Sequence, residues 1–361
     1  MAFKKVQMKK CFINGISAIS AQNTFESDFL DSAVVNQTTT TLSAIEPDYK
    51  TFIPPAAIRR MAKGIKMGVA TSVQALQKAE LEQIDAIITG TGMGCSQDSE
   101  KFLKSILDNN EQFLTPTSFI QSTHNTVAAQ IALRLSCKGY NFTYVNGAVS
   151  FESALLDGCM QITSEEAKSI LVGGIDEYAE HTFSLYKLIG LIKNEQDKPF
   201  SVLNSKSKGT VFSEGATFFA LENIRKDSTY AEVVDVQIKN KISKEKLPDF
   251  FDAFLKKNNL NTSEIDVVVL GNNGDMEFDC YFEKVSNYLP DSVQVYYKHL
   301  SGEYNTASAF GLWVAANMLK KQQIPEVIRL NSVEKQQYKT ILLYNQYRGL
   351  DHSLVLLRGV L

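Results

Sequence analysis

The sequence predicts a layered α/β fold whose central strands are buried on both faces. Four short apolar runs rich in β-branched residues end in glycine, and continuous runs of this kind are typical of strands covered on both sides. Segments with apolar residues at every third or fourth position lie between them and predict amphipathic helices. Alternating strands and helices of this kind indicate an α/β class. The runs are 85–94, 169–174, 266–274 and 340–349.

The second half of the chain repeats a feature of the first. Residues 84–90 (IDAIITG) and 265–271 (IDVVVLG) both open with Ile-Asp, continue as an apolar run and end in glycine. Each run follows a predicted amphipathic helix, over 58–83 in the first case and 247–260 in the second. The repeat indicates a duplicated α/β unit.

The boundary between the two predicted halves lies near residues 224–230. This segment is polar and follows a strand-like run over 217–222. No Pro- or Ser-rich linker is present there, so we expect the halves, 1–225 and 226–361, to pack as one unit.

Composition narrows the function classes. The 361 residues carry 37 Lys+Arg against 40 Asp+Glu, a net charge of −3, whereas nucleic-acid binders normally show a basic excess. The hydrophobic fraction of 44% suffices for a large core, and no run approaches the roughly 18 apolar residues that a membrane helix needs. The basic N-terminus has no clear cleavage site and predicts a first strand ending at Gly15 rather than a signal peptide.

The five cysteines are spread along the chain without a CxxC-type motif. This usage favours a reduced, cytoplasmic protein and no zinc or redox centre. The sequence GTGMG (90–94) lacks the full dinucleotide fingerprint, and no phosphate-binding loop is present. We therefore expect no cofactor and no metal.

Residues 148–162 predict a buried helix, because their small and apolar side chains point in nearly every direction around it. A strand-like run over 141–145 precedes the helix. Many enzymes hold a nucleophile at such a turn, where the helix N-terminus stabilises negative charge. The residue type at this turn therefore bears directly on whether the chain is a catalyst.

Six segments carry a resemblance that spans essentially the whole chain. They are 11–20 (CFINGISAIS), 90–94 (GTGMG), 115–145, 170–178 (ILVGGIDEY), 198–222 and 298–311 (KHLSGEYNTASAFG). In this order they resemble the motifs of the β-ketoacyl synthases, condensing enzymes of the thiolase fold. The resemblance implies a thiolase-like, layered αβαβα fold built from two duplicated halves.

The same resemblance implies that the catalytic side chains are missing. Val149 stands where the family has its cysteine nucleophile, and Asn273 and Glu303 stand where it has two histidines. Valine has no lone pair to attack a thioester, and a carboxylate repels a developing enolate. Lys298 matches the lysine of the family's KS-TGH motif, whereas residues 345–349 are bulkier than its C-terminal glycine loop.

The turn at 146–158 and the STHNT segment at 122–126 also resemble chain-length-factor-type subunits, as in aryl polyene and flexirubin-like pigment clusters. Such a subunit is a non-catalytic partner of an active β-ketoacyl-ACP synthase. It shapes, across a heterodimer interface near residues 142–146, the tunnel that receives the acyl chain of the acyl carrier protein. The candidate tunnel and interface residues are Phe119, Thr123, His124 and Phe151. Thr123 aligns with a position where side-chain bulk limits acyl length.

Two alternatives stay open on the same fold. One is a stand-alone acyltransferase or malonyl-thioester decarboxylase, for which Ser150, Cys159 and His124 are the residues to consider. The other is a scaffold for acyl carrier protein, an acidic partner that would dock on basic residues. The basic helix start that contains Arg59, Arg60, Lys63 and Lys66 is the candidate surface.

Overall fold

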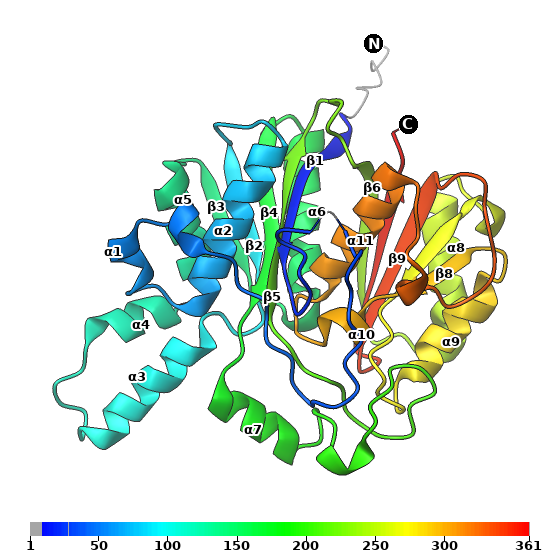
Figure 1. The fold of residues 1–361 in the computed structure, drawn as a ribbon. Helices are drawn as coiled ribbons and strands as arrows, with labels where there is room; N and C mark the ends of the chain where they lie inside the picture. The colour runs from blue at the N-terminus through cyan, green and yellow to red at the C-terminus, as the bar shows by residue number, and fades with distance from the viewer. Residues whose placement is uncertain (1–8, 28, 361) are drawn as a thin grey trace.

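The computed structural model describes residues 9–27 and 29–360. Within these residues the chain forms five layers, in the order helix, sheet, helix, sheet, helix (Figure 1). From the left of Figure 1 these are α2 and α5, the strands of the first half, α6 and α11, the strands of the second half, and α8 and α9. The expected αβαβα arrangement is therefore present.

The two sheet layers are the halves of one continuous sheet. Over the described residues its strand order is β3-β2-β4-β5-β1-β6-β10-β9-β7-β8. The two halves of the sheet meet through only three paired positions of β1 and β6, Cys11 to Ile13 opposite Val233 to Ala231. The strands are β1 (Cys11–Ile19), β2 (Ala86–Gly90), β3 (Tyr140–Tyr144), β4 (Ser169–Asp176), β5 (Gly215–Glu222), β6 (Ala231–Asn240), β7 (Val267–Leu270), β8 (Val293–Tyr296), β9 (Thr340–Tyr347) and β10 (Asp351–Arg358).

The helices occupy the outer and central layers. The α-helices are α1 (Pro55–Ile58), α2 (Lys63–Lys78), α3 (Ser96–Asp108), α4 (Pro116–Ser122), α5 (Thr126–Leu135), α6 (Ser150–Thr163), α7 (Glu180–Leu188), α8 (Leu247–Lys257), α9 (Asp279–Tyr288), α10 (Lys298–Ser301) and α11 (Ser308–Lys321). Single 3-10 turns are η1 (Tyr49–Thr51), η2 (Gly147–Val149), η3 (Glu195–Asp197), η4 (Lys244–Lys246), η5 (Thr262–Glu264) and η6 (Glu326–Ile328). No helix in the described ranges is long and apolar enough to cross a membrane.

The expected duplication is visible in the strand order. Read outward from the centre, β1-β5-β4-β2-β3 on one side corresponds to β6-β10-β9-β7-β8 on the other. β2 pairs in parallel with β3 and β4, and β7 pairs in parallel with β8 and β9. The two halves therefore have the same topology.

The repeated Ile-Asp dipeptide has the same structural role in both halves. The carboxylate of Asp85 accepts hydrogen bonds from the backbone N–H groups of Lys168 and Ser169, where β4 begins. Asp266 accepts the equivalent bonds from Lys339 and Thr340, where β9 begins. Each aspartate thus satisfies backbone donors at the start of the neighbouring parallel strand, which explains why the dipeptide recurs.

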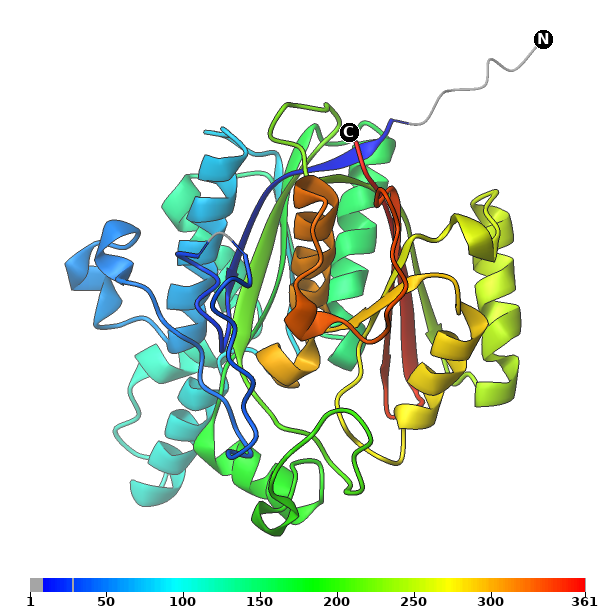
Figure 2. The ribbon, with the colours of Figure 1, turned by 45° about the vertical axis from the view of Figure 1, so that its right-hand side comes forward.

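Three hydrophobic clusters hold the layers together, because each central strand sends alternate side chains to opposite faces. Ile87 of β2 packs under α2 and α5, whereas Ile88 faces the central layer. In the second half, Val269 of β7 faces the same central layer and Val268 packs under α8 and α9. The central layer of α6 and α11 therefore carries the core that both halves share (Figure 2).

The sequence predicted that the first strand ends at Gly15, and this prediction was wrong. β1 continues to Ile19, with an irregularity in its pairing to β5 between Ile13 and Gly15. A Cβ at Gly15 would collide with the backbone carbonyl oxygen of Ala75 in α2. The glycine therefore marks a close approach of helix and strand rather than a strand end.

Gly90, at the end of β2, is expected to be intolerant of any side chain. A Cβ there would lie 2.5 Å from the carbonyl carbon of Ser150 and 2.6 Å from the amide nitrogen of Phe151, both backbone atoms of α6. Gly90→Ala should therefore displace α6 and lower the free energy of unfolding by about 1–3 kcal/mol in urea titrations. Gly359→Ala is the matched control, because its Cβ would meet its nearest neighbour at 3.5 Å. Equal stabilities of the two variants would contradict this packing.

Candidate functional site

The turn between β3 and α6 carries no free nucleophile. Val149 ends the 3-10 turn η2, acts as N-cap of α6 and is only 2% exposed. The hydroxyl of the next residue, Ser150, donates to the carbonyl of Gly147 at 2.7 Å and accepts from the amide of Asn146 at 2.8 Å. Both hydrogen-bonding roles of this hydroxyl are thus used within the turn, which leaves Ser150 as a structural residue.

The positions Asn273 and Glu303, thirty residues apart in sequence, meet in the structure. The Nδ2 atom of Asn273 donates to Oε2 of Glu303 at 2.7 Å, and both side chains are buried. The Nζ atom of Lys298 lies 2.9 and 2.8 Å from the two carboxylate oxygens of Glu303. We call Asn273, Lys298 and Glu303 the polar triad.

The polar triad is sealed from solvent. The side chains of Lys298 and Glu303 are 2% and 3% exposed, so each charge depends on the other for compensation. Lys298 belongs to α10, Glu303 follows that helix, and Asn273 follows β7. The ion pair is therefore built mainly within one short segment, and the amide of Asn273 attaches the β7 loop to it.

The backbone near the polar triad contains a glycine, Gly271, at a position that has no room for a side chain. A Cβ at Gly271 would collide with Oδ1 of Asn345 and would lie 3.5 Å from Cε of Lys298. Asn345 lies in β9, and its Oδ1 is buried without a hydrogen-bond partner among the described residues. The segment 345–349 is the end of β9 and the turn to β10, with Gly349 at a φ of +63°.

A further buried carboxylate, Glu152 of α6, lies close to the polar triad. Its Oε1 accepts from Ser353 at 2.7 Å, while its Oε2 has no partner among the described residues. Burial raises the pKa of Glu152, and the hydrogen bond from Ser353 and the charge of Lys298 oppose that rise. The sequence offered one signal for it, since Glu152 is the first charged residue in an otherwise small and apolar helix.

Asp176 fixes the GTGMG turn against the loop that leads into α11. One of its carboxylate oxygens accepts from the amide of Gly92 at 2.8 Å and from the hydroxyl of Thr91 at 3.2 Å. The other accepts from both the amide and the hydroxyl of Thr306 at 2.9 Å. The turn is thus held in place by a buried carboxylate.

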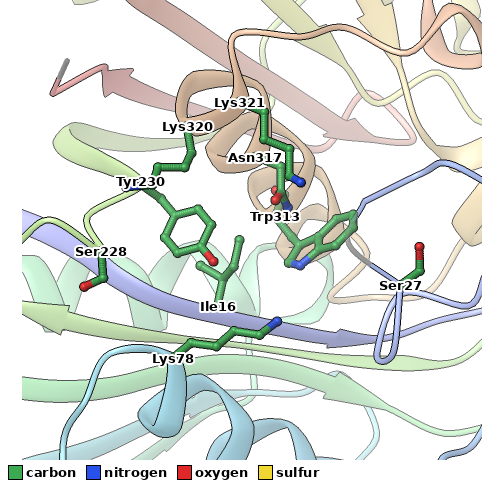
Figure 3. A pocket seen from close by; sticks show the side chains of 9 residues that line it. All are labelled: Ile16, Ser27, Lys78, Ser228, Tyr230, Trp313, Asn317, Lys320 and Lys321. Carbon is green, nitrogen blue, oxygen red and sulfur yellow. The ribbon is translucent and has the colours of Figure 1, made fainter.

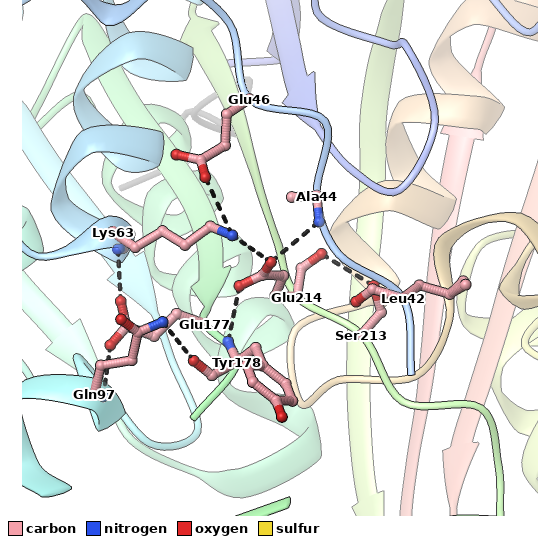
Figure 4. A network of polar contacts seen from close by, with 10 residues as sticks. Leu42, Ala44, Glu46, Lys63, Gln97, Glu177, Tyr178, Ser213 and Glu214 are labelled. Atoms are coloured by element: carbon pink, nitrogen blue, oxygen red, sulfur yellow. Dashed lines mark hydrogen bonds and ion pairs between the residues drawn. The ribbon is translucent and has the colours of Figure 1, made fainter. Parts of the chain in front are cut away.

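The neighbouring residue, Glu177, joins two helix starts (Figure 4). Its two oxygens accept from the amide of Gly64, near the start of α2, at 2.6 Å and from that of Gln97, near the start of α3, at 2.8 Å. A carboxylate at a helix N-terminus satisfies orphan N–H groups and interacts favourably with the helix dipole. Burial nevertheless raises the pKa of Glu177 to about 7. Glu177 therefore anchors the start of the α3–α4 arm, which projects at the lower left of Figure 1.

Two lysines at the basic start of α2 make contacts within the protein. The Nζ atom of Lys63 lies 2.6 Å from Glu214 and 3.2 Å from Glu46, as Figure 4 shows. The ammonium of Lys66 lies 5.3 Å from the ring centroid of Tyr49. The two carboxylates therefore compensate the charge of Lys63, one of the residues that the sequence offered as a docking surface for an acidic carrier protein.

The candidate tunnel residues lie in two different environments. Phe119 of α4 is exposed and packs against Phe102 at 5.2 Å between ring centroids. The hydroxyl of Thr123, at the end of the same helix, lies 2.6 Å from that of Thr126. Phe151, by contrast, is fully buried and packs in the central core. Phe119 and Thr123 are therefore exposed at the surface of this chain, whereas Phe151 is not.

The remaining residues considered as replacement nucleophiles or bases do not gather at the turn. The exposed residue His124 lies against the GTGMG turn, since a Cβ on Gly94 would come within 3.4 Å of its ring. The Sγ atom of Cys159 lies 3.5 Å from that of Cys11. No group of three His, Cys, Asp or Glu side chains in the described ranges is arranged to hold a metal ion.

A separate cavity of about 390 Å³ opens between the ends of α2 and α11, beside β1 (Figure 3). Its lining residues are Ile16, Ser27, Lys78, Ser228, Tyr230, Trp313, Asn317, Lys320 and Lys321. None of them belongs to the polar triad or to the turn at Val149. This cavity is therefore distinct from the site that the sequence motifs define.

Comparison with known proteins places the chain in a family. The family model "Beta-ketoacyl synthase, N-terminal domain" matches residues 11–226, which is more than half of the sequence. The chain belongs to the β-ketoacyl synthase family. No curated protein matches the sequence.

Solved structures confirm the thiolase-like fold. The ishigamide ketosynthase/chain length factor has a TM-score of 0.81 at 18% identity, and a β-ketoacyl synthase from Burkholderia phymatum STM815 has 0.82 at 15%. The AntDE:AntF structure, a type II PKS acyl-carrier protein in complex with its ketosynthase bound to the hexaketide, has 0.77 at 15%. In all three comparisons 98% of this chain and 100% of the other chain are covered.

The buried ion pair of the polar triad generates a stability prediction. Lys298→Met leaves Glu303 buried without its counter-charge and should cost about 3–5 kcal/mol of unfolding free energy at pH 8. The double variant Lys298→Met/Glu303→Gln removes both charges and should recover most of this loss. Urea titrations of the parent, of the single variants Lys298→Met and Glu303→Gln, and of the double variant form a double-mutant cycle. Additive losses in that cycle would show that the two charges do not compensate each other.

Asp279, at the start of α9, generates a pH prediction. Burial first, and repulsion by Asp275 second, raise the pKa of Asp279 to about 7. Because the folded-state pKa of Asp279 lies above its value of about 4 in the unfolded chain, stability falls as the pH rises from about 4 to about 7 and then stays level. Asp279→Asn mimics the neutral form, so its melting temperature relative to the parent should rise between pH 5 and about 7 and stay level up to pH 8.5. A difference that stays constant over this range would contradict the assignment.

Proposed function

We propose that this chain is a non-catalytic, chain-length-factor-like partner of an active β-ketoacyl-ACP synthase in polyketide or fatty-acid-type biosynthesis, of the aryl polyene kind. In this role it forms a heterodimer with the synthase in the cytoplasm. It forms part of the tunnel that receives the acyl chain carried by the acyl carrier protein. Its five free cysteines fit the reducing conditions of that compartment.

The observation that carries the proposal is the closed polar triad, taken together with a turn that ends in valine. The three positions where the family has its cysteine and its two histidines hold Val149, Asn273 and Glu303. The carboxylate of Glu303 is fully engaged by Lys298 and Asn273, so it offers neither a proton nor a free donor to an enolate. A stabiliser of negative charge is thus replaced by a buried negative charge, which opposes condensation chemistry.

The edge strand β3 supports the heterodimer. β3 is the terminal strand of the sheet and pairs only with β2 among the described strands. Its aromatic residues Tyr140, Phe142 and Tyr144 stack along one face, and Phe142 is 44% exposed. An unpaired edge with exposed aromatic side chains is normally covered by a partner.

The related structures support the choice of partners. One of the similar structures is a ketosynthase/chain length factor, and another contains an acyl-carrier protein with its ketosynthase.

The two alternatives, a stand-alone enzyme and a docking scaffold, receive less support from the geometry. A stand-alone enzyme lacks an available nucleophile at the turn, and a docking scaffold would lose Lys63 to its contacts with Glu46 and Glu214.

Co-purification tests the heterodimer. This chain, carrying the only affinity tag, is co-expressed with the cysteine-containing β-ketoacyl synthase encoded nearest to it in the same genome. We expect a one-to-one complex, and we expect Phe142→Asp to reduce its yield at least about tenfold, since a buried unpaired charge destabilises an interface. Leu188→Asp on α7, a residue that is 82% exposed, is the control and should leave the yield unchanged. An undiminished complex with Phe142→Asp would contradict the proposed interface.

Thr123→Phe tests the tunnel. A packed tunnel does not absorb additional volume cheaply, so the larger ring should shift the complex to shorter acyl products. Mass spectrometry of the carrier-bound products measures the shift. Thr262→Phe in η5 introduces the same ring at an exposed position of the second half and should leave the products unchanged. An unaltered product distribution with Thr123→Phe would remove this residue from the tunnel.

A further inference from the structure

Two cysteines from distant parts of the chain are in contact in the folded protein. Cys11 is the first residue of β1, and Cys159 lies in the third turn of α6. Their Sγ atoms are 3.5 Å apart although 148 positions separate them in the sequence. Sulfur atoms at this distance touch without a bond, and both thiols are free.

The surroundings of the two thiols differ. Cys11 is fully buried, and its hydrogen bond with Cys159, together with burial, raises its pKa well above the usual value. Cys159 is only partly buried, next to Met160, which is exposed. Cys159 is thus the thiol that a small oxidant reaches first, and Cys11 is the thiol placed to react with the product.

We propose that Cys11 and Cys159 form a reversible disulfide on exposure to a peroxide, and that this bond is a redox modification site of the protein. In the first step the Cys159 thiolate attacks hydrogen peroxide: an S–O bond forms, the O–O bond breaks, and the leaving hydroxide takes up a proton to become water. In the second step Cys11 loses its proton to solvent and attacks the sulfur of Cys159. The S–S bond forms, the S–O bond breaks and a second water leaves.

Two of the other three cysteines, Cys95 and Cys137, provide the contrast. Cys95 is buried, and burial together with the nearby carboxylates of Glu177 and Asp98 raises its pKa. Cys137 is partly exposed, and its Sγ atom donates to the carbonyl of Ile84 at 3.5 Å. Cys137 therefore serves as a matched control, because it has similar exposure and a backbone acceptor in place of a thiol neighbour.

The disulfide would attach the central strand β1 to α6, the helix that follows the turn at Val149 and contacts the edge strand β3. α6 begins directly after Val149, and its Asp157 accepts hydrogen bonds from Tyr140 and Tyr144 of β3 at 3.2 Å. A cross-link that closes a loop of this length restricts the unfolded chain strongly. The oxidised form should therefore melt at a temperature several degrees above that of the reduced form.

The experiment uses the full chain, reduced, freed of reductant and exposed to hydrogen peroxide at graded concentrations in native buffer. Remaining thiols are then alkylated under denaturing conditions and counted by intact mass. We expect the parent and Cys137→Ser to lose two alkylatable thiols with a mass decrease of two hydrogens, to yield a linked peptide pair containing Cys11 and Cys159, and to recover with dithiothreitol. We expect Cys159→Ser to form no such link.

Several results would overturn the proposal. These are a parent protein that keeps all five thiols, a Cys159 that proceeds to sulfinic acid without a cross-link, or a link that joins other cysteines. A link that appears only when urea is present during oxidation would also count against it, because the proposed reaction depends on the folded contact. Melting curves of oxidised and reduced parent protein, with Cys159→Ser as control, provide the second readout.

Discussion

The structure around the candidate site depends on one constraint: the charges of Lys298 and Glu303 are buried and must compensate each other. Neither side chain reaches water, so each would be strongly destabilising without the other. Asn273 completes the arrangement by donating to the same carboxylate. Gly271 has to be a glycine for Asn345 to lie where it does. The polar triad is thus a tightly fitted centre that is closed to solvent.

This closed centre lies within a duplicated architecture that the sequence partly reveals. The two Ile-Asp dipeptides begin equivalent strands, and Asp85 and Asp266 accept equivalent backbone hydrogen bonds. The central layer of α6 and α11 then packs against both halves. α6 has a special position in this arrangement, because it begins directly after Val149, carries the buried carboxylate of Glu152 and contacts the edge strand through Asp157. One helix therefore connects the turn at Val149 with the surface at which we place the partner.

The sequence predicted the fold well because buried strands and duplicated motifs leave strong local patterns. It placed the first strand end at Gly15, where the glycine instead permits α2 to approach β1 closely; a one-residue pattern does not distinguish these cases. No local pattern indicates that Asn273 and Glu303 are in contact, since thirty residues, two helices and a strand separate them. The contact between Cys11 and Cys159 has no sequence signal at all, because it depends on how a helix and a strand pack. The tunnel assignment of Phe119 and Thr123 stays a prediction, because it depends on a surface that a partner would complete.

The central claim is that the polar triad marks a subunit without condensing activity of its own. Malonyl-dependent elongation of acyl carrier protein thioesters tests it most directly, measured for this chain alone, for the partner synthase alone and for the purified complex. The account predicts no turnover by this chain alone, and activity in the complex whose product length differs from that of the synthase alone. Robust turnover by this chain alone would contradict it, and would mean that a nucleophile outside the turn at Val149 performs the chemistry.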